Sequence, residues 1–229
     1  QCAGSVYVVF LLLGSRASLQ RETFMFTEVT MYLSKVLLNG ADCRNPYEIH
    51  RILWKLFPED AQTDRDFLFH VEKSERTAVL ILMQSARKPE VSYSGAKLLA
   101  CKEYNLTLQK EQRLRFVLVA NPVKTINDEN GRTNKKGDLK KCRVPLIRDD
   151  EQRDWFTRKL KPGAEMEEIF IDPRHPLYFR RLGMAGKIKP IVFQGILKVV
   201  EPEMLVQLIQ NGIGPAKGFG CGLMMVRRV

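Results

Sequence analysis

Tyr47 and His50 stand at a spacing that suits acid–base chemistry. They are three positions apart in the segment 45–58, NPYEIHRILWKLFP, and residues three apart lie on one side of a helix. A neutral imidazole can accept a proton from a ribose 2′-hydroxyl or, once protonated, donate one to a leaving 5′-oxygen, and a phenol beside it can position the phosphate or share the proton transfer. We interpret the pair as candidate catalytic residues. The alternative is a surface histidine and tyrosine without chemistry.

A glycine-rich segment near the C-terminus is the second candidate site. Residues 212–222, GIGPAKGFGCG, contain five glycines and one lysine, so the backbone can approach a ligand closely while Lys217 supplies a charge. The segment is neither a Walker A loop, since no Gly-Lys-Ser/Thr ends it, nor a dinucleotide fingerprint, since only seven residues follow it. A phosphate-binding loop and a tight helix-to-strand connection both remain open. The RNA-binding candidates here are Gly212, Gly214, Lys217, Gly218, Gly220 and Gly222.

The charge of the chain favours an anionic partner. Its 229 residues include 37 Lys and Arg against 26 Asp and Glu, a formal net charge of +11, which suits nucleic acid or an anionic membrane surface. The surplus is local, because residues 1–30 are neutral overall while 124–148 are strongly basic, and 174–198 and 204–229 contain no Asp or Glu. From these runs we add Arg180, Arg181, Lys187 and Lys189 to the RNA-binding candidates. The longest apolar run, 6–13, is far shorter than the roughly 20 residues of a membrane span, so no membrane partner is expected.

Residue types and spacing exclude several other sites. The five cysteines form no CxxC pair and there are three histidines, so a cysteine-rich zinc site is not expected. No carboxylates gather at metal-binding spacing, and we expect neither a metal nor another cofactor. An odd, scattered set of cysteines is typical of a reducing compartment, so we predict a cytoplasmic protein. His70, on an apolar strand, is predicted to be a core residue and His175 a loop residue.

The elements that must position these residues follow two similar patterns. A strand at 31–38 precedes a helix over 45–57, which Asn45 caps and Pro46 begins. Further strands are predicted at 67–71, 77–83, 113–120, 168–170, 187–200 and 222–229, and further helices at 150–160 and from Pro202 to Gly212. This order predicts an α+β fold of two tandem ferredoxin-like (RRM-like) modules. The expected divisions are an extension at 1–30, a first module at 31–125, a basic loop or hairpin at 126–148 and a second module at 149–229.

Several motifs together resemble one family over residues 31–229. They are MYLSKV (31–36), YEIHRILWKLFP (47–58), RDFLFHVEK (65–73), ANPVKT (120–125), KKCRVPLI (140–147), GKIKPIVFQG (186–195) and GIGPAKGFGCGL (212–223). The combination is similar to the CasE/Cse3 family, the CRISPR-associated repeat-processing endoribonucleases of type I-E systems, and the glycine-rich segment is a mark of the wider RAMP superfamily. Residues 1–30 match no motif of this family.

The resemblance implies a specific reaction and specific partners. It implies metal-independent cleavage of precursor CRISPR RNA at the base of the repeat stem-loop, by 2′-hydroxyl attack that leaves a 2′,3′-cyclic phosphate and a 5′-hydroxyl. It places the family's catalytic histidine on His50 and its partner tyrosine on Tyr47. It implies that the protein stays bound to the product hairpin of the mature CRISPR RNA and joins the other subunits of the Cascade surveillance complex. The alternative is a non-catalytic subunit that binds the RNA hairpin and serves assembly.

Overall fold

The computed structural model describes most of the chain after the first 29 residues. The described residues are 30–40, 43, 45–57, 65–90, 95–129, 131–134, 136–181 and 184–229. The predicted N-terminal extension lies outside them, apart from residue 30.

The first module is a four-stranded antiparallel sheet with one helix against it. Its strands are β1 (Tyr32–Asn39), β2 (Phe67–Ser74), β3 (Ala78–Ser85) and β4 (Ala96–Glu103), and its helix is α1 (Pro46–Trp54). The order β2-β3-β1-β4 puts the first and third strands in the centre, which is the ferredoxin-like arrangement. Since β2 is an edge strand, one side of it remains open to other parts of the chain.

Helix α1 forms where the sequence predicts a capped helix. The Asn45 side chain accepts a hydrogen bond from the Tyr47 N–H at 3.2 Å, and Pro46 occupies the first turn, where its missing N–H costs nothing. Ile49 and Leu53 are buried against the sheet. The helix ends at Trp54 rather than at residue 57, and this register leaves His50 on the side that faces β2.

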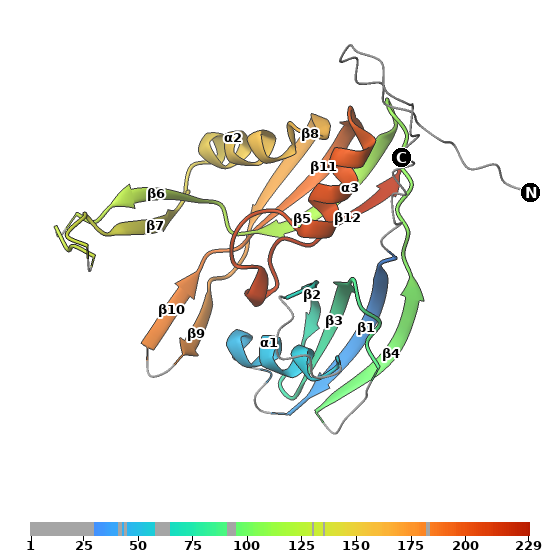
Figure 1. Ribbon diagram of the computed structural model, residues 1–229, viewed down its shortest axis with the longest axis horizontal. Coiled ribbons are helices and arrows are strands. Elements are labelled where there is room, and N and C mark those ends of the chain that lie inside the picture. Colours follow the sequence, from blue (N-terminus) through green and yellow to red (C-terminus); the bar gives the residue numbers. More distant parts are fainter. Residues whose placement is uncertain are drawn as a thin grey trace, which may run out of the picture.

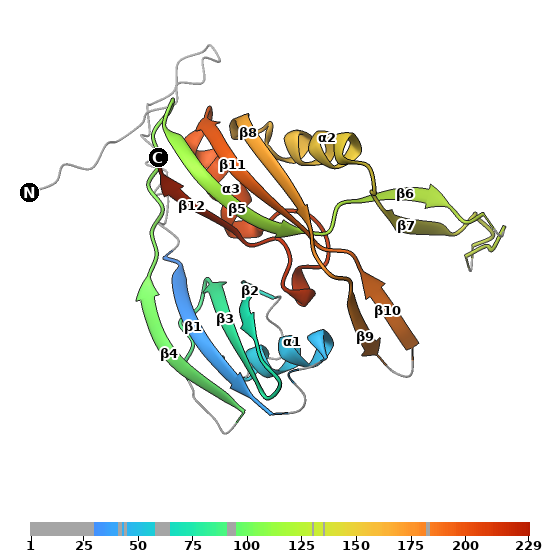
Figure 2. The same cartoon turned by 180° about the vertical axis from the view of Figure 1, so that it is seen from behind.

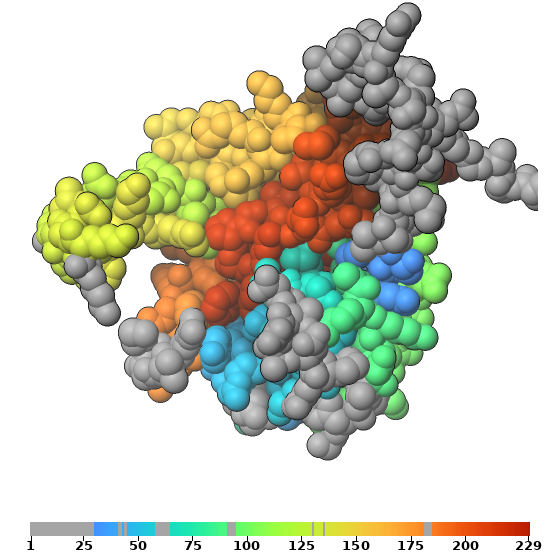
Figure 3. Space-filling view, in the orientation of Figure 1, coloured from blue at the N-terminus to red at the C-terminus, as the bar shows by residue number. Residues whose placement is uncertain are grey.

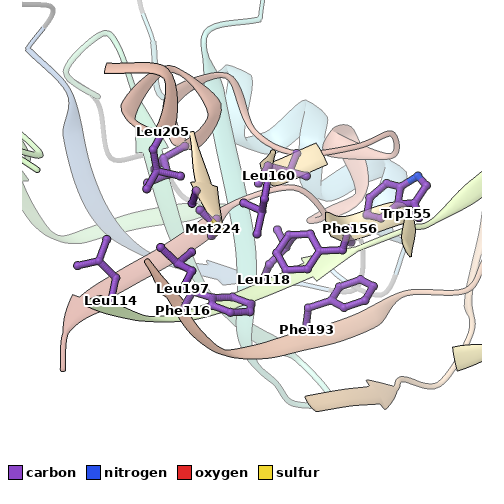
Figure 4. Close-up of a cluster of buried hydrophobic side chains, with 14 of the residues drawn as sticks. Leu114, Phe116, Leu118, Trp155, Phe156, Leu160, Phe193, Leu197, Leu205 and Met224 are labelled. Atoms are coloured by element: carbon purple, nitrogen blue, oxygen red, sulfur yellow. The ribbon is translucent and has the colours of Figure 1, made fainter. Parts of the chain in front are cut away.

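The second module has the same strand order and two helices. Its strands are β5 (Arg113–Ala120), β8 (Ala164–Pro173), β11 (Ile191–Val199) and β12 (Met224–Arg228), in the order β12-β5-β11-β8, and its helices are α2 (Asp149–Leu160) and α3 (Pro202–Asn211). Phe116, Phe156 and Phe193 stack in the core between helices and sheet (Figure 4). The two predicted ferredoxin-like modules are therefore both present.

One strand belongs to the other module. The sequence analysis placed 113–120 in the first module, but β5 pairs with β11 and β12 of the second sheet. The edge position beside β1 is taken by β4, which was not predicted because most of its side chains are exposed and show no clear alternation. The first sheet therefore ends with Glu103, and the expected boundary at residue 125 is wrong.

Two hairpins project from the second module. The hairpin of β6 (Val123–Asn127) and β7 (Lys141–Pro145), called the basic hairpin below, forms in the predicted basic stretch. The segment 187–200 is split by Pro190: β10 (Met184–Ile188) pairs with β9 (Leu177–Arg181), which the sequence analysis missed, and β11 starts at Ile191. Figures 1 and 2 show both hairpins extending beyond the helices, and the β9–β10 hairpin reaches down beside α1.

The glycine-rich segment lies at the junction of the modules. Figure 3 shows the red C-terminal part of the chain between the cyan first module and the yellow and orange parts of the second. At the same junction the buried Gln84 of β3 donates its side-chain amide to the carbonyls of Ile209 and Gln210, at 3.3 and 3.4 Å, at the end of α3. The modules are thus joined where the sequence places its second candidate site.

Candidate active site

His50 lies on α1 beside the beginning of β2. Its ring centroid is 5.5 Å from that of Phe67 and 6.2 Å from that of Trp54 on the next turn of the helix. Its Nε2 atom is shielded from solvent and has no hydrogen-bond partner among the described residues. An unpaired buried nitrogen is uncommon in folded proteins, and Nε2 thus keeps an unused hydrogen-bonding position.

The surroundings keep His50 neutral. Burial, together with the positive charge of Arg65, lowers the pKa of His50 to about 4. At pH 7 the imidazole therefore has a lone pair that can accept a proton. Tyr47 lies one turn earlier on α1, as predicted, and its part in the chemistry stays a prediction.

The glycine-rich segment contacts α1 through η2 (Lys217–Phe219). A Cβ atom added to Gly218 would lie 3.6 Å from Cδ2 of His50 and 3.6 Å from Nη1 of Arg65. The other four glycines, Gly212, Gly214, Gly220 and Gly222, have φ angles of 74°, 83°, 80° and 94°, which glycine adopts without strain. Four glycines thus shape the connection from α3 to β12, and Gly218 faces His50; phosphate binding by the segment stays a prediction.

Arg65 is the functional candidate that the sequence analysis missed. It precedes β2, its Nε atom is buried without a partner among the described residues, and burial lowers its pKa. The sequence signal is a basic residue two positions before the apolar strand 67–71, within one of the family motifs, and it does not by itself indicate a role. Only the fold shows that it faces His50.

Lys217 is held in place at the same junction. Its ammonium group donates to the carbonyl of Asn211 at the end of α3, at 2.6 Å. Burial lowers the pKa of Lys217, and the charges of Arg65 and Lys159 lower it further. The predicted RNA-binding lysine therefore lies among cations close to His50.

The β9–β10 hairpin is attached to this site by two contacts. Phe179 packs against Phe219 of η2 with ring centroids 4.4 Å apart, and the Asn45 side chain at the start of α1 donates to the carbonyl of Arg180 at 3.3 Å. The hairpin thus brings the predicted residues Arg180 and Lys187 to the same side of the molecule as His50. Both are exposed, and the Lys187 ammonium group lies 5.2 Å from the centre of the Tyr178 ring.

The structure gives less detail on two of the predicted RNA-binding residues, Lys189 and Arg181. Lys189 is exposed between β10 and β11. Arg181 is the last residue of β9, and its side chain lies outside the described part of the structure.

Comparisons with known proteins show the family of the chain. The family model described as "CRISPR associated protein" matches residues 31–228. The chain belongs to this CRISPR-associated family. The CRISPR system Cascade subunit CasE of Escherichia coli K12 is 44% identical over 195 residues, which cover 85% of this chain and 98% of that protein.

Solved structures from the CRISPR-associated family have the same fold. The crystal structure of Cas6e from Escherichia coli K-12 superposes with a TM-score of 0.75 at 42% identity, covering 86% of this chain and 100% of that one. Cse3 of Thermus thermophilus, a CRISPR-associated endoribonuclease, is 29% identical over 220 residues, 86% of this chain and 99% of that protein. Its structure bound to an RNA that represents a pre-cleavage complex gives a TM-score of 0.67 at 28% identity, covering 86% of this chain and 99% of that one.

The other histidines lie where the sequence predicts. His70 is buried on β2 with 8% of its surface exposed, and His175 is exposed in the turn between β8 and β9.

Within the described ranges, no three His, Cys, Asp or Glu side chains group in a way that could hold a metal ion. The helices of the described part are all too short or too polar to cross a membrane.

Proposed function

We propose that this member of the CRISPR-associated family is a metal-independent endoribonuclease that cuts precursor CRISPR RNA at the base of its repeat stem-loop. The observation that carries the proposal is the meeting of a neutral His50, Gly218 and the cations Arg65 and Lys217 at one point. The relatives supply the substrate class, because one is named a CRISPR-associated endoribonuclease and was solved with RNA.

The geometry supports an internal attack on the phosphodiester. Neutral His50 accepts the proton of the 2′-hydroxyl at Nε2, and the 2′-oxygen forms a bond to the adjacent phosphorus. The bond from phosphorus to the 5′-oxygen breaks, which leaves a 2′,3′-cyclic phosphate and a 5′-hydroxyl. The leaving oxygen receives its proton from Tyr47 or from His50 after it has been protonated. An RNA phosphate beside His50 opposes the effect of Arg65 on the pKa and makes that second role accessible.

The basic segments bind the RNA hairpin in this proposal. Arg180, Arg181, Lys187 and Lys189 contact phosphates along the β9–β10 hairpin, while Lys217 and the glycine backbone hold the strand near the cleaved bond. Cation and backbone contacts of this kind persist after cleavage, so the protein keeps the product hairpin.

One relative is named a Cascade subunit, and we propose that this chain also joins that complex with the bound RNA. Among the described residues no two cysteines form a disulfide, in keeping with a reducing cytoplasm.

Replacement of His50 tests the reaction directly. The unmodified chain and His50→Ala are incubated with a cognate repeat RNA in EDTA, and the ends of the products are identified. We expect the unmodified chain to yield a 2′,3′-cyclic phosphate, and the variant to lose at least about 100-fold in single-turnover rate, the order of a lost acid–base group, while its affinity for the hairpin survives. Full cleavage by the variant would contradict the assignment of His50.

The alternative function is distinguished by the same assay. A non-catalytic assembly subunit would bind the hairpin tightly and give no product with the unmodified chain. The unpaired, shielded Nε2 of His50 argues for the enzyme, because a subunit without chemistry gains nothing from leaving a buried nitrogen unsatisfied.

A further inference from the structure

Arg65 and Lys217 lie near His50 without an acidic partner among the described residues. The charge of Arg65 lowers the pKa of both His50 and Lys217, and the charge of the exposed Lys159 also lowers the pKa of Lys217. No described carboxylate acts on the pKa of His50, Arg65 or Lys217. Asp66, the acid next in sequence to Arg65, is paired instead with Arg87 at 2.6 Å. Partly buried cations such as Arg65 and Lys217 are normally paired with an acid, and these two residues with Lys159 are called the cation cluster below.

Within the cation cluster, Arg65 is the member best placed to meet the substrate. Its Nη1 atom and the ring of His50 are each 3.6 Å from the same point, the position of a Cβ on Gly218. The ammonium group of Lys217 is already engaged by the Asn211 carbonyl at 2.6 Å, whereas Arg65 Nε has no partner in the described chain. Gly218 leaves this point open because it carries no side chain.

Arg65 is also reachable from outside the protein. It lines a hollow of about 330 Å³ together with Leu68 of β2 and with Gln210 and Asn211 at the end of α3. Arg65 is thus the residue that the hollow shares with the surroundings of Gly218.

We propose that Arg65 is a catalytic residue whose guanidinium group binds the non-bridging oxygens of the scissile phosphate over the side of Gly218 that faces His50, where the residue carries no side chain. The inference rests on the proposed function. As the 2′-oxygen bonds to phosphorus and before the 5′-oxygen leaves, negative charge builds on those oxygens. Arg65 meets this charge with two N–H groups of fixed geometry and stays protonated throughout.

The first experiment measures binding without chemistry. Two RNA hairpins are compared, one ending just before the scissile phosphate and one extended past it by two nucleotides, with a 2′-deoxyribose at the cleavage position. For the unmodified chain we expect the extension to tighten binding by about 10-fold, the size of a hydrogen bond to a charged group. In Arg65→Gln the extension should add almost nothing. An equal gain in both proteins would overturn the proposal, whether or not the chain cleaves RNA.

The second experiment measures the chemical step with the enzyme in excess over cognate RNA. We expect Arg65→Gln to slow cleavage by about 100- to 1000-fold and Arg65→Lys, which keeps the charge and loses the paired donors, by about 10-fold. The control is Arg51→Gln on α1, since Arg51 is exposed and bound to Glu48 at 3.0 Å, and its rate should not change. A rate in Arg65→Gln equal to that of the control, in protein whose melting temperature is preserved, would overturn the proposal.

A variant of Gly218 probes the same point from the other side. Gly218→Ala fits sterically, because its Cβ would meet its nearest neighbours at 3.6 Å, ordinary contact distance. The methyl group then takes up part of the space proposed for the phosphate, so we expect the gain from the RNA extension to disappear while the melting temperature stays the same. A stable Gly218→Ala that keeps the full gain would contradict the placement of the phosphate. If the unmodified chain fails to cleave but shows the gain, the proposed function fails while the phosphate site of Arg65 stands.

Discussion

At the scale of the residue, His70 shows how burial sets a protonation state. It lies on β2 with 8% of its surface exposed, and its pKa is lowered to about 4 by burial and by the charge of Arg174, against a smaller opposing effect of Glu72. In the unfolded chain a histidine has a pKa near 6.5. Between these two values the unfolded state binds the additional proton, so acidification favours unfolding.

We therefore predict that His70 makes the protein acid-sensitive. Its contribution to the free energy of unfolding is fully present above about pH 6.5 and is lost as the pH falls from 6.5 toward 4. Between pH 7 and pH 5 the loss should be on the order of 1–2 kcal/mol. Urea unfolding at both pH values measures this loss in the unmodified protein and in His70→Gln. The contributions of all other titrating groups cancel when the two losses are subtracted. An identical pH dependence in the two proteins would show that folding does not lower the pKa of His70.

At the scale of the element, α1 is fixed by a residue with two functions. The side-chain oxygen of Asn45 accepts from the N–H of Tyr47 and caps the helix, while its nitrogen donates to the Arg180 carbonyl on β9. The first contact stabilises the helix that carries His50, and the second joins that helix to the β9–β10 hairpin. Two substitutions can separate these contacts.

We predict different effects for Asn45→Asp and Asn45→Ala. Aspartate keeps the capping oxygen but cannot donate to Arg180, so stability should change little while backbone hydrogen exchange in residues 177–188 becomes faster. Alanine loses both contacts and should also cost about 1 kcal/mol of stability. Denaturant unfolding and hydrogen exchange measure the two effects. Equal protection of the hairpin in all three proteins would mean that the contact at 3.3 Å does not hold it.

The same scale shows what the sequence could predict. The cap at Asn45, the stripe that buries Ile49 and Leu53, and the presence of two ferredoxin-like modules follow from local patterns. The mostly exposed strand β4 has no such pattern, and the pairing of β5 with β11 is a contact between segments about 70 residues apart that only the fold determines. The sequence does not indicate a role for Arg65 for the same reason, because Arg65 lies beside His50 only once the start of β2 packs against the glycine-rich segment.

At the scale of the whole molecule, the surplus positive charge is divided between separate regions of the fold. The cation cluster lies at the junction of the modules, and the basic hairpin of β6 and β7 extends away from it, on the far side from β4 (Figure 1). Lys140 and Lys141 are exposed on this hairpin, and Lys97 and Lys102 are exposed on β4. Binding of the RNA at a distance from His50 can therefore be tested separately from cleavage.

We predict that the basic hairpin contributes to affinity and not to the chemical step. Each phosphate contact of a lysine releases a counterion and adds nearly one unit to the slope of log affinity against log salt concentration. The double variant Lys140→Gln/Lys141→Gln should bind the RNA hairpin more weakly and reduce this slope by about 1 to 2, while the cleavage rate at saturating RNA stays the same. Lys97→Gln/Lys102→Gln removes the same charge from β4 and should change neither quantity, since that edge lies on the opposite side of the first module from α1 and the glycine-rich segment. Equal slopes for the two double variants would show that net charge, rather than its position on this hairpin, governs RNA binding.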